Sequence, residues 1–194
     1  MIIIKRNSFT LIELILVVGI IAILAGAVIP IIQQARLKAW AAKIVQLIAT
    51  LRNACVMFHS DTGLYAMETQ NGTDLNFLSA NPTAIANWDG PYIDRPLYPY
   101  DFYKDNLTII AIVHPQMVTT FDLDGDGTFD KLVTSVGNSL VVALIPENLA
   151  REIDRSIDIN TPGDWRINGR VGFTPSAPFS GRGALFVYLI GGSS

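Results

Sequence analysis

Four aspartates stand within nine positions in the second half of the chain, and they are Asp122, Asp124, Asp126 and Asp130. Carboxylates at this spacing repel one another unless a cation neutralises them, and the intervening glycines permit a tight turn. Oxygen ligands on such a turn suit Ca2+ better than Mg2+, which demands a stricter octahedron. The pattern favours a calcium site, and the alternative is a solvated turn between two strands.

The spacing of these oxygens matches the first part of an EF-hand calcium loop. The four aspartates would occupy loop positions 1, 3, 5 and 9, and Thr128 would offer its backbone carbonyl at position 7. Position 12, which in an EF-hand holds a bidentate glutamate, is Val133 here. We therefore expect a calcium-binding connection between strands instead of an EF-hand.

Glu13 is the second residue whose position needs a chemical explanation. It is the only strongly polar side chain between Phe9 and Ile32, a run of 24 residues. A helix of that length reaches about 36 Å, enough to cross a hydrocarbon core of about 30 Å. A carboxylate there is costly without a partner, and no cationic residue lies three or four positions away.

Three interpretations of the N-terminus compete. In a secretory signal peptide, Lys5 and Arg6 would precede an apolar stretch that ends in the small residues 25–27. A plain membrane anchor is the second interpretation. In the third, cleavage between Ser8 and Phe9 creates an α-amino group, and a neighbouring copy presents this amine to Glu13. Only the third interpretation explains the carboxylate.

The run SFTLIEL at residues 8–14, with the basic pair upstream and Pro30 downstream, resembles the type III leader of type IV pilins and type II secretion pseudopilins. The resemblance implies that prepilin peptidase cuts before Phe9, that the new N-terminus is methylated, and that Glu13 guides docking. It also implies a helical homopolymer, assembled by inner-membrane machinery from subunits that first lie in lipid. The family normally has glycine before the cut, where this chain has Ser8.

The N-terminal helix is expected to continue beyond the membrane-length segment as one rod. Gly19, Ala22 and Gly26 fall on one face, where small residues allow helices to approach closely. Pro30 predicts a kink or local melting. From about residue 33 to 59 the apolar positions form a stripe at steps of three and four: Leu37, Ala41, Ile44, Ile48, Leu51, Cys55 and Phe58. Cys55 is expected to be buried and inert within it.

Residues 61–106 are rich in Gly, Pro, Asn and Asp and are expected to be mostly irregular. The run WDGPY at residues 88–92 resembles the loop after the long helix in major pseudopilins, a family that also suggests calcium in a loop comparable to 122–130. The aromatic residues of this region are expected to cover the sheet: Trp88, Tyr92, Tyr98 and Tyr100.

Strands are predicted further along, at residues 107–113, 117–121, 131–136, 139–145 and 184–190, with a short helix over 146–154. An antiparallel sheet of this kind can bury the helical stripe. The predicted fold is therefore α+β, a pilin-like ladle with a long N-terminal helix packed on an antiparallel sheet. Its parts would be a leader (1–8), a membrane and filament-core helix (9–32), an amphipathic continuation (33–60) and a globular domain (61–194).

Composition excludes several classes of function. Half of the residues are hydrophobic and 16% are charged, which rules out a disordered polyelectrolyte. The net charge of −3 gives no general basic field for nucleic acid, and one cysteine excludes a disulfide framework. His59 and His114 belong to no catalytic or metal motif, so no enzyme is expected.

The expected function is that of a structural subunit of a type IV pilus-like filament with a calcium-stabilised domain, which passes from the inner membrane into an extracellular or periplasm-spanning polymer. A type II secretion pseudopilin is the first alternative. The second is a secreted or membrane-anchored calcium-binding protein that does not polymerise.

Overall fold

The computed structural model describes residues 10–70, 73–97, 111–116, 119–132, 135–159, 161–176 and 181–191. It contains two α-helices and six strands: α1 (Leu11–Thr62), β1 (Thr69–Gln70), β2 (Thr73–Asp74), β3 (Ala111–Gln116), β4 (Val136–Pro146), α2 (Glu147–Ile157), β5 (Val171–Pro175) and β6 (Arg182–Gly191). The chain divides into two compact units, Met1–Lys38 and Ala39–Ser194. The second half of α1 thus belongs to the unit that contains the sheet.

The predicted helix is confirmed, and it passes through Pro30 without a break, so the local melting expected there is wrong. Helix α1 ends at Thr62, and Gly63 follows with a φ of 71°. Its amide donates to the His59 carbonyl at 2.8 Å. A glycine in this left-handed conformation is the expected stop signal after a helix.

The large sheet is antiparallel, with the order β3-β4-β6-β5. Its register aligns Val113, Leu140, Val187 and Val171 across the four strands, and all four side chains are buried. Side chains opposite one another on neighbouring strands share a face, so this row forms part of one apolar face. The predicted α+β class, with a long helix and an antiparallel sheet, is therefore confirmed.

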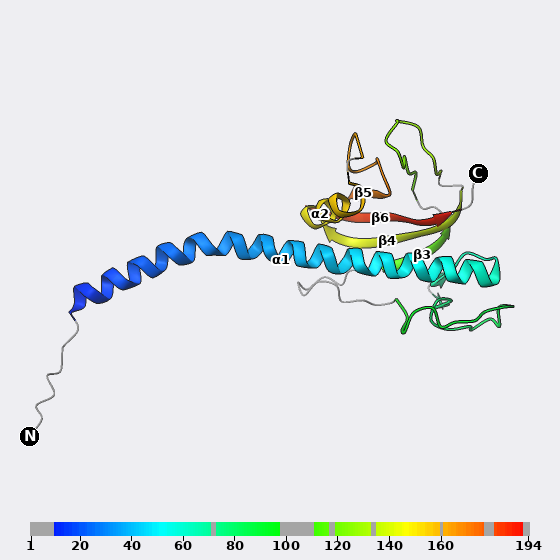
Figure 1. The fold of residues 1–194 in the computed structure, drawn as a ribbon, viewed down its shortest axis with the longest axis horizontal. Helices are drawn as coiled ribbons and strands as arrows, with labels where there is room; N and C mark the ends of the chain where they lie inside the picture. The colour runs from blue at the N-terminus through cyan, green and yellow to red at the C-terminus, as the bar shows by residue number, and fades with distance from the viewer. Residues whose placement is uncertain are drawn as a thin grey trace, which may run out of the picture. The chain divides into compact units, whose positions relative to one another are not determined.

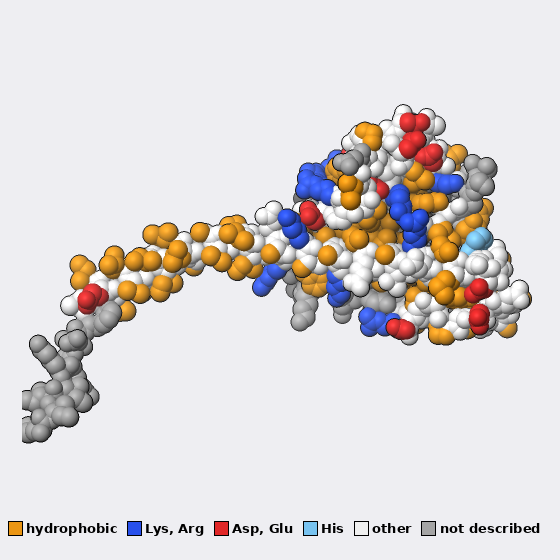
Figure 2. Space-filling model, viewed as in Figure 1, with side chains coloured by type: hydrophobic (Ala, Val, Ile, Leu, Met, Phe, Trp, Pro, Cys, Tyr) orange, Lys and Arg blue, Asp and Glu red, His pale blue; other side chains and the backbone are white. Residues whose placement is uncertain are grey.

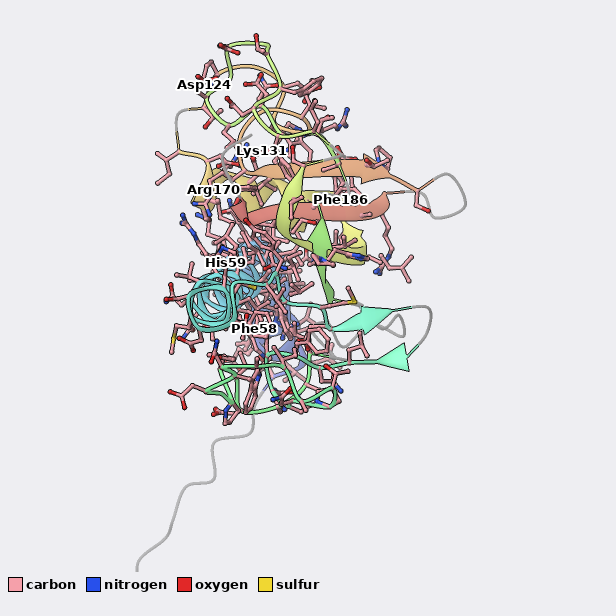
Figure 3. All side chains as sticks on the ribbon, turned by 90° about the vertical axis from the view of Figure 1, so that its right-hand side faces the viewer. Phe58, His59, Asp124, Lys131, Arg170 and Phe186 are labelled. Atoms are coloured by element: carbon pink, nitrogen blue, oxygen red, sulfur yellow. The ribbon has the colours of Figure 1, made fainter. Side chains whose placement is uncertain are left out.

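From Ala41 onward the apolar stripe of α1 is buried, together with Ala54, at Ala41, Ile44, Ile48, Leu51, Ala54, Cys55 and Phe58. Leu37, the first residue of the predicted stripe, is only partly buried. In the second unit α1 lies between the sheet on one side and the segment 66–97 on the other (Figures 1 and 3). The periodicity in sequence thus predicts the buried face of the helix correctly.

The aromatic residues of segment 88–92 cover the helix instead of the sheet, which corrects the expectation. The ring of Tyr92 packs edge-on against Phe58 at 5.7 Å between centroids and against Trp88 at the same distance. Tyr92 also donates its hydroxyl hydrogen to Asp61 of α1 at 2.8 Å. Tyr98 and Tyr100 lie outside the described residues.

Two predicted strands, at 117–121 and 131–136, are not found among the described residues before β4. Within 117–121 and 131–136 the structure has an isolated bridge between Phe121 and Lys131, and residues 117, 118, 133 and 134 lie outside the described part. Strands β4 and β6 confirm the predictions for 139–145 and 184–190. Strand β3 (Ala111–Gln116) contains the described end of the prediction for 107–113, and residues 107–110 lie outside the described part. The short helix is confirmed as α2.

Three strands were not predicted. Strand β5 forms the edge of the large sheet, and β1 and β2 pair as a two-residue hairpin within 61–106. Apart from the last two residues of α1, the other described residues of that segment are irregular, as expected.

Candidate functional site

The first unit presents an apolar helix surface that none of its described residues covers. From Leu11 to Ile32 the large hydrophobic side chains have exposed fractions between 44% (Val17) and 77% (Leu11). This part of α1 is long and apolar enough to cross a membrane, by length and composition. Figure 2 shows its hydrophobic side chains all along the visible face of the segment. Such a surface requires lipid or neighbouring helices around it.

Glu13 has a local partner that the sequence analysis missed. Its Oε2 accepts hydrogen bonds from the Thr10 amide at 2.9 Å and the Thr10 hydroxyl at 2.7 Å. The Thr10 hydroxyl oxygen in turn accepts from the Glu13 amide at 3.4 Å. This is a capping box, and its sequence signal is a threonine followed by glutamate three positions later. Glu13 therefore lies in the first turn of the helix, and its negative charge stands at the positive end of the helix dipole.

The other predicted assembly residues, Gly19, Ala22, Gly26 and Pro30, lie on the same helix. Gly19 and Gly26 have no atom within 4 Å of the position where a Cβ would stand, and Ala22 is exposed. Their common face is therefore open in the subunit. Ser8 and Phe9, the predicted processing residues, lie outside the described part of the chain.

The acidic loop lies between the two residues of the isolated bridge. Phe121 and Lys131 exchange backbone hydrogen bonds at 2.8 and 3.0 Å, and this pairing closes the loop. Asp122 is only 2% exposed, and its two oxygens accept from the amides of Gly125 at 2.8 Å and Gly127 at 2.9 Å. Both glycines have positive φ, at 78° and 90°, a conformation that other residues rarely adopt.

The structure brings three of the four predicted carboxylates together. Oxygens of Asp122, Asp124 and Asp130 all lie within 4.8 Å of one another, which is close enough to share a metal ion. Asp126 is not part of this group, and its Oδ1 accepts from the Thr128 amide at 2.7 Å. Three carboxylates of the loop thus form a cluster, and the fourth, Asp126, stabilises a turn.

A second segment supports the loop, and no motif in the sequence indicated it. The Asp122 carbonyl accepts from the Gly169 amide, and Asp122 forms a parallel bridge with Asn168. Next to this contact, Asp158 accepts from the amides of Arg170 and Val171, both at 2.8 Å. The position of the acidic loop is therefore tied to the end of α2 and the start of β5.

The histidines and the cysteine occupy separate structural positions. The His59 ring stacks on Tyr65 at 4.4 Å, and its Nδ1 lies 2.9 Å from the Leu64 carbonyl. Burial lowers the pKa of His114. Cys55 is fully buried, and burial, with a smaller contribution from Glu68, raises the pKa of its thiol. A thiol of this kind is a poor nucleophile.

Comparison with known proteins adds independent evidence. Residues 4–29 match the model of the prokaryotic N-terminal methylation motif. The chain is 31% identical over 123 residues, 63% of its length, to the type II secretion system core protein G of Vibrio cholerae serotype O1, and it covers 83% of that relative. The proteins of the same name from Aeromonas hydrophila and Klebsiella pneumoniae are 36% and 29% identical, with 64% and 87% of their lengths covered and 47% and 63% of this chain matched. No solved structure gives a significant match.

The methylation motif, the long apolar helix and the antiparallel sheet together define a pilin-like protein. The chain also covers most of the length of two of these relatives. It therefore belongs to the family of type IV pilins and type II secretion pseudopilins.

Proposed function

We propose that the protein is a structural subunit of a pilus-like filament, assembled from the inner membrane by its N-terminal helix. The observation that carries this proposal is the exposed apolar surface from Leu11 to Ile32, which the chain itself leaves uncovered in the first unit. Lipid would surround this surface before assembly, and the helices of other copies would replace the lipid in the filament.

Processing is the first step of the proposed assembly. The methylation motif over residues 4–29 supports cleavage between Ser8 and Phe9 by prepilin peptidase. The new amine would begin one residue before Thr10, the cap of α1. Mass spectrometry of the mature protein should therefore find Phe9 at the N-terminus, with a methyl group on its nitrogen. A mature chain that starts near Val28 would indicate an ordinary signal peptide and contradict the proposal.

Glu13 has two roles to separate, because it caps its own helix and, as proposed, receives the amine of a neighbouring copy. Glu13→Leu removes both, whereas Glu13→Gln keeps an acceptor for the capping box and loses only the charge. If charge guides docking, both variants should reduce filament yield by about tenfold or more while remaining in the membrane. Full yield from Glu13→Gln would mean that the residue serves only as a helix cap.

A type II secretion pseudopilus is the second candidate for the filament. It is favoured by the relatives, each of which is a core protein of a type II secretion system. A strain without this protein should then retain in its periplasm proteins that are normally secreted. Loss of surface filaments with unchanged secretion would favour a pilus.

We further propose that the acidic loop binds Ca2+ and stabilises the second unit. The cluster of Asp122, Asp124 and Asp130 supports this, because a buried carboxylate lies beside two exposed ones. The loop lacks a bidentate glutamate, so the expected dissociation constant is roughly 0.1 to 1 mM. Calcium at a hundredfold excess over that constant would stabilise the fold by about 2.7 kcal/mol.

Thermal melting of the full chain in detergent tests the calcium proposal. Calcium should raise the melting temperature relative to chelator, and Asp124→Asn should abolish the difference. Asp126→Asn is the matched control, since Asp126 lies outside the cluster and should leave most of the calcium effect intact. Equal melting temperatures with calcium and chelator would identify the loop as an ordinary turn. A calcium-dependent monomer that never forms filaments would instead support the non-polymerising alternative.

A further inference from the structure

Two arginines, one just before β5 and one on α1, are near enough to influence each other electrostatically. Arg170 precedes β5, and its Nη2 donates to the Tyr188 carbonyl at 3.4 Å. Arg52, on α1, is close enough to repel it: burial lowers the pKa of Arg170 and Arg52 lowers it further. Figure 3 shows Arg170 on the side of the sheet that leads down to His59 of α1, and Figure 2 shows Lys and Arg side chains gathered over this face.

This arginine pair has little compensating negative charge. Arg52 is exposed, and within the described part of the chain it makes no hydrogen bond or ion pair. Asp158 attracts Arg170, yet the Asp158 oxygen that accepts hydrogen bonds takes them from the backbone amides of Arg170 and Val171. Two guanidinium groups therefore share at most one carboxylate, which leaves an excess of positive charge at this place.

A pair of aspartates elsewhere on the same unit carries uncompensated negative charge. Asp61, near the end of α1, accepts from the Tyr92 hydroxyl at 2.8 Å, and the Asp89 amide donates to the same hydroxyl oxygen at 3.1 Å. Burial raises the pKa of Tyr92, and both carboxylates raise it further. Asp61 and Asp89 are exposed, and neither forms an ion pair within the residues described.

The geometry of α1 places the two pairs on opposite sides of one helix. Arg52 and Asp61 are nine residues apart, which at about 100° per residue is two and a half turns. The same separation corresponds to about 14 Å along the helix axis. The pairs therefore face away from each other within one copy.

We propose that Arg52 and Arg170 of one copy bind Asp61 and Asp89 of the next copy in the filament. Two different surfaces of the same chain then meet, and such a contact repeats without closing, as a filament requires. Copies with parallel α1 helices would be staggered by about 14 Å along the helix. The inference rests on the proposed function and adds the surfaces that set the register between neighbours.

Cysteine cross-linking of full-chain filaments tests the contact directly. In the double variant Arg52→Cys with Asp89→Cys, oxidation should produce a ladder of covalent oligomers, because each copy carries both halves of the contact. Either single variant should produce no ladder, since residue 52 meets residue 89 and not another residue 52. The unmodified chain is a suitable background, because its single cysteine, Cys55, is fully buried.

Charge exchange gives a second test that does not depend on cross-linking. Arg52→Glu and Asp89→Lys should each lower filament yield by roughly threefold to tenfold, as expected for partly exposed ion pairs that set register. Together the two substitutions should restore most of the yield. Arg155→Glu is the matched control, because it makes the same change of charge at an exposed arginine of α2 that belongs to neither pair.

The outcomes separate this inference from the proposed function. Abundant filaments with no ladder from the double cysteine variant, or no rescue by the charge exchange, would overturn the contact and leave the filament function intact. A failure of the unmodified chain to form any filament would overturn the proposed function, and the contact with it.

Discussion

Asp154 is a buried acid on the inner face of α2 whose charge the fold does not compensate. It is 7% exposed, and its Oδ1 receives no hydrogen bond from the described residues. Burial, followed by the neighbouring charge of Asp158, raises its pKa to about 7. Between the ordinary value of 3.8 and about 7 the folded chain therefore binds more protons at this site than the unfolded chain.

The sign of the pH dependence follows from that difference. The contribution of Asp154 to stability should fall as the pH rises from about 4 to about 7. Asp154→Asn should remove this slope and, at pH 8, increase the free energy of unfolding by about 1–3 kcal/mol. Denaturant titrations at pH 4.5 and 8 measure the effect, with Glu152→Gln on the same helix as the control. A slope unchanged by Asp154→Asn would show that the carboxylate is hydrated.

At the scale of single residues, the sequence predicts chemical type better than geometry. It identified Asp122, Asp124 and Asp130, because like charges at short spacing are visible without coordinates. It could not exclude Asp126 from the cluster, because the choice depends on which amides the turn presents. For Glu13 the signal is present in the sequence, since threonine and glutamate three positions apart form a capping box, whereas a partner of opposite charge is absent at that spacing.

Helix α1 is held in the second unit by its apolar stripe, and Phe58 is the largest side chain of that stripe. It is fully buried and contacts Phe77 at 6.1 Å and Tyr92 at 5.7 Å between ring centroids. Phe58→Ala should lower the free energy of unfolding by about 3–5 kcal/mol, because the cavity lies between two packed layers. Met57→Ala is the neighbouring control, since Met57 is 54% exposed and should change stability by less than 0.5 kcal/mol. Equal losses from the two variants, measured by denaturant unfolding, would contradict this account of the core.

At the scale of elements, periodicity predicted helices well and strands less well. A stripe extending over several turns of α1 averages out local exceptions, whereas a strand of five residues does not. Strand β5 contains Gly172 and ends at Pro175, and both residues are unfavourable in strands, so the sequence does not predict this strand. Around the acidic loop, apolar residues next to the aspartates suggested two strands, but the described chain there forms isolated bridges, between Phe121 and Lys131 and between Asp122 and Asn168.

The whole molecule separates a unit for association from a unit with a core. All the buried hydrophobic residues that the structure describes lie at Ala41 or later. A chain of residues 39–194 should therefore fold without the first unit, remain in solution without detergent and melt cooperatively. Calorimetry and size-exclusion chromatography measure these properties, with the full chain in detergent as the reference. A truncated chain that aggregates or melts without cooperativity would show that the first unit contributes to the core.

The capping box of α1 has a consequence for the reversibility of assembly. A free subunit already gives Glu13 two hydrogen bonds from Thr10 and a favourable helix dipole. On docking as proposed, the Glu13 carboxylate would exchange part of these interactions for an ion pair with a neighbour's amine. The free energy gained is only the difference between the interactions formed and those lost. A subunit that leaves the filament regains its own cap as it departs. Subunits could therefore be added and removed repeatedly, without the large energetic penalty of exposing an uncompensated carboxylate to lipid at each cycle.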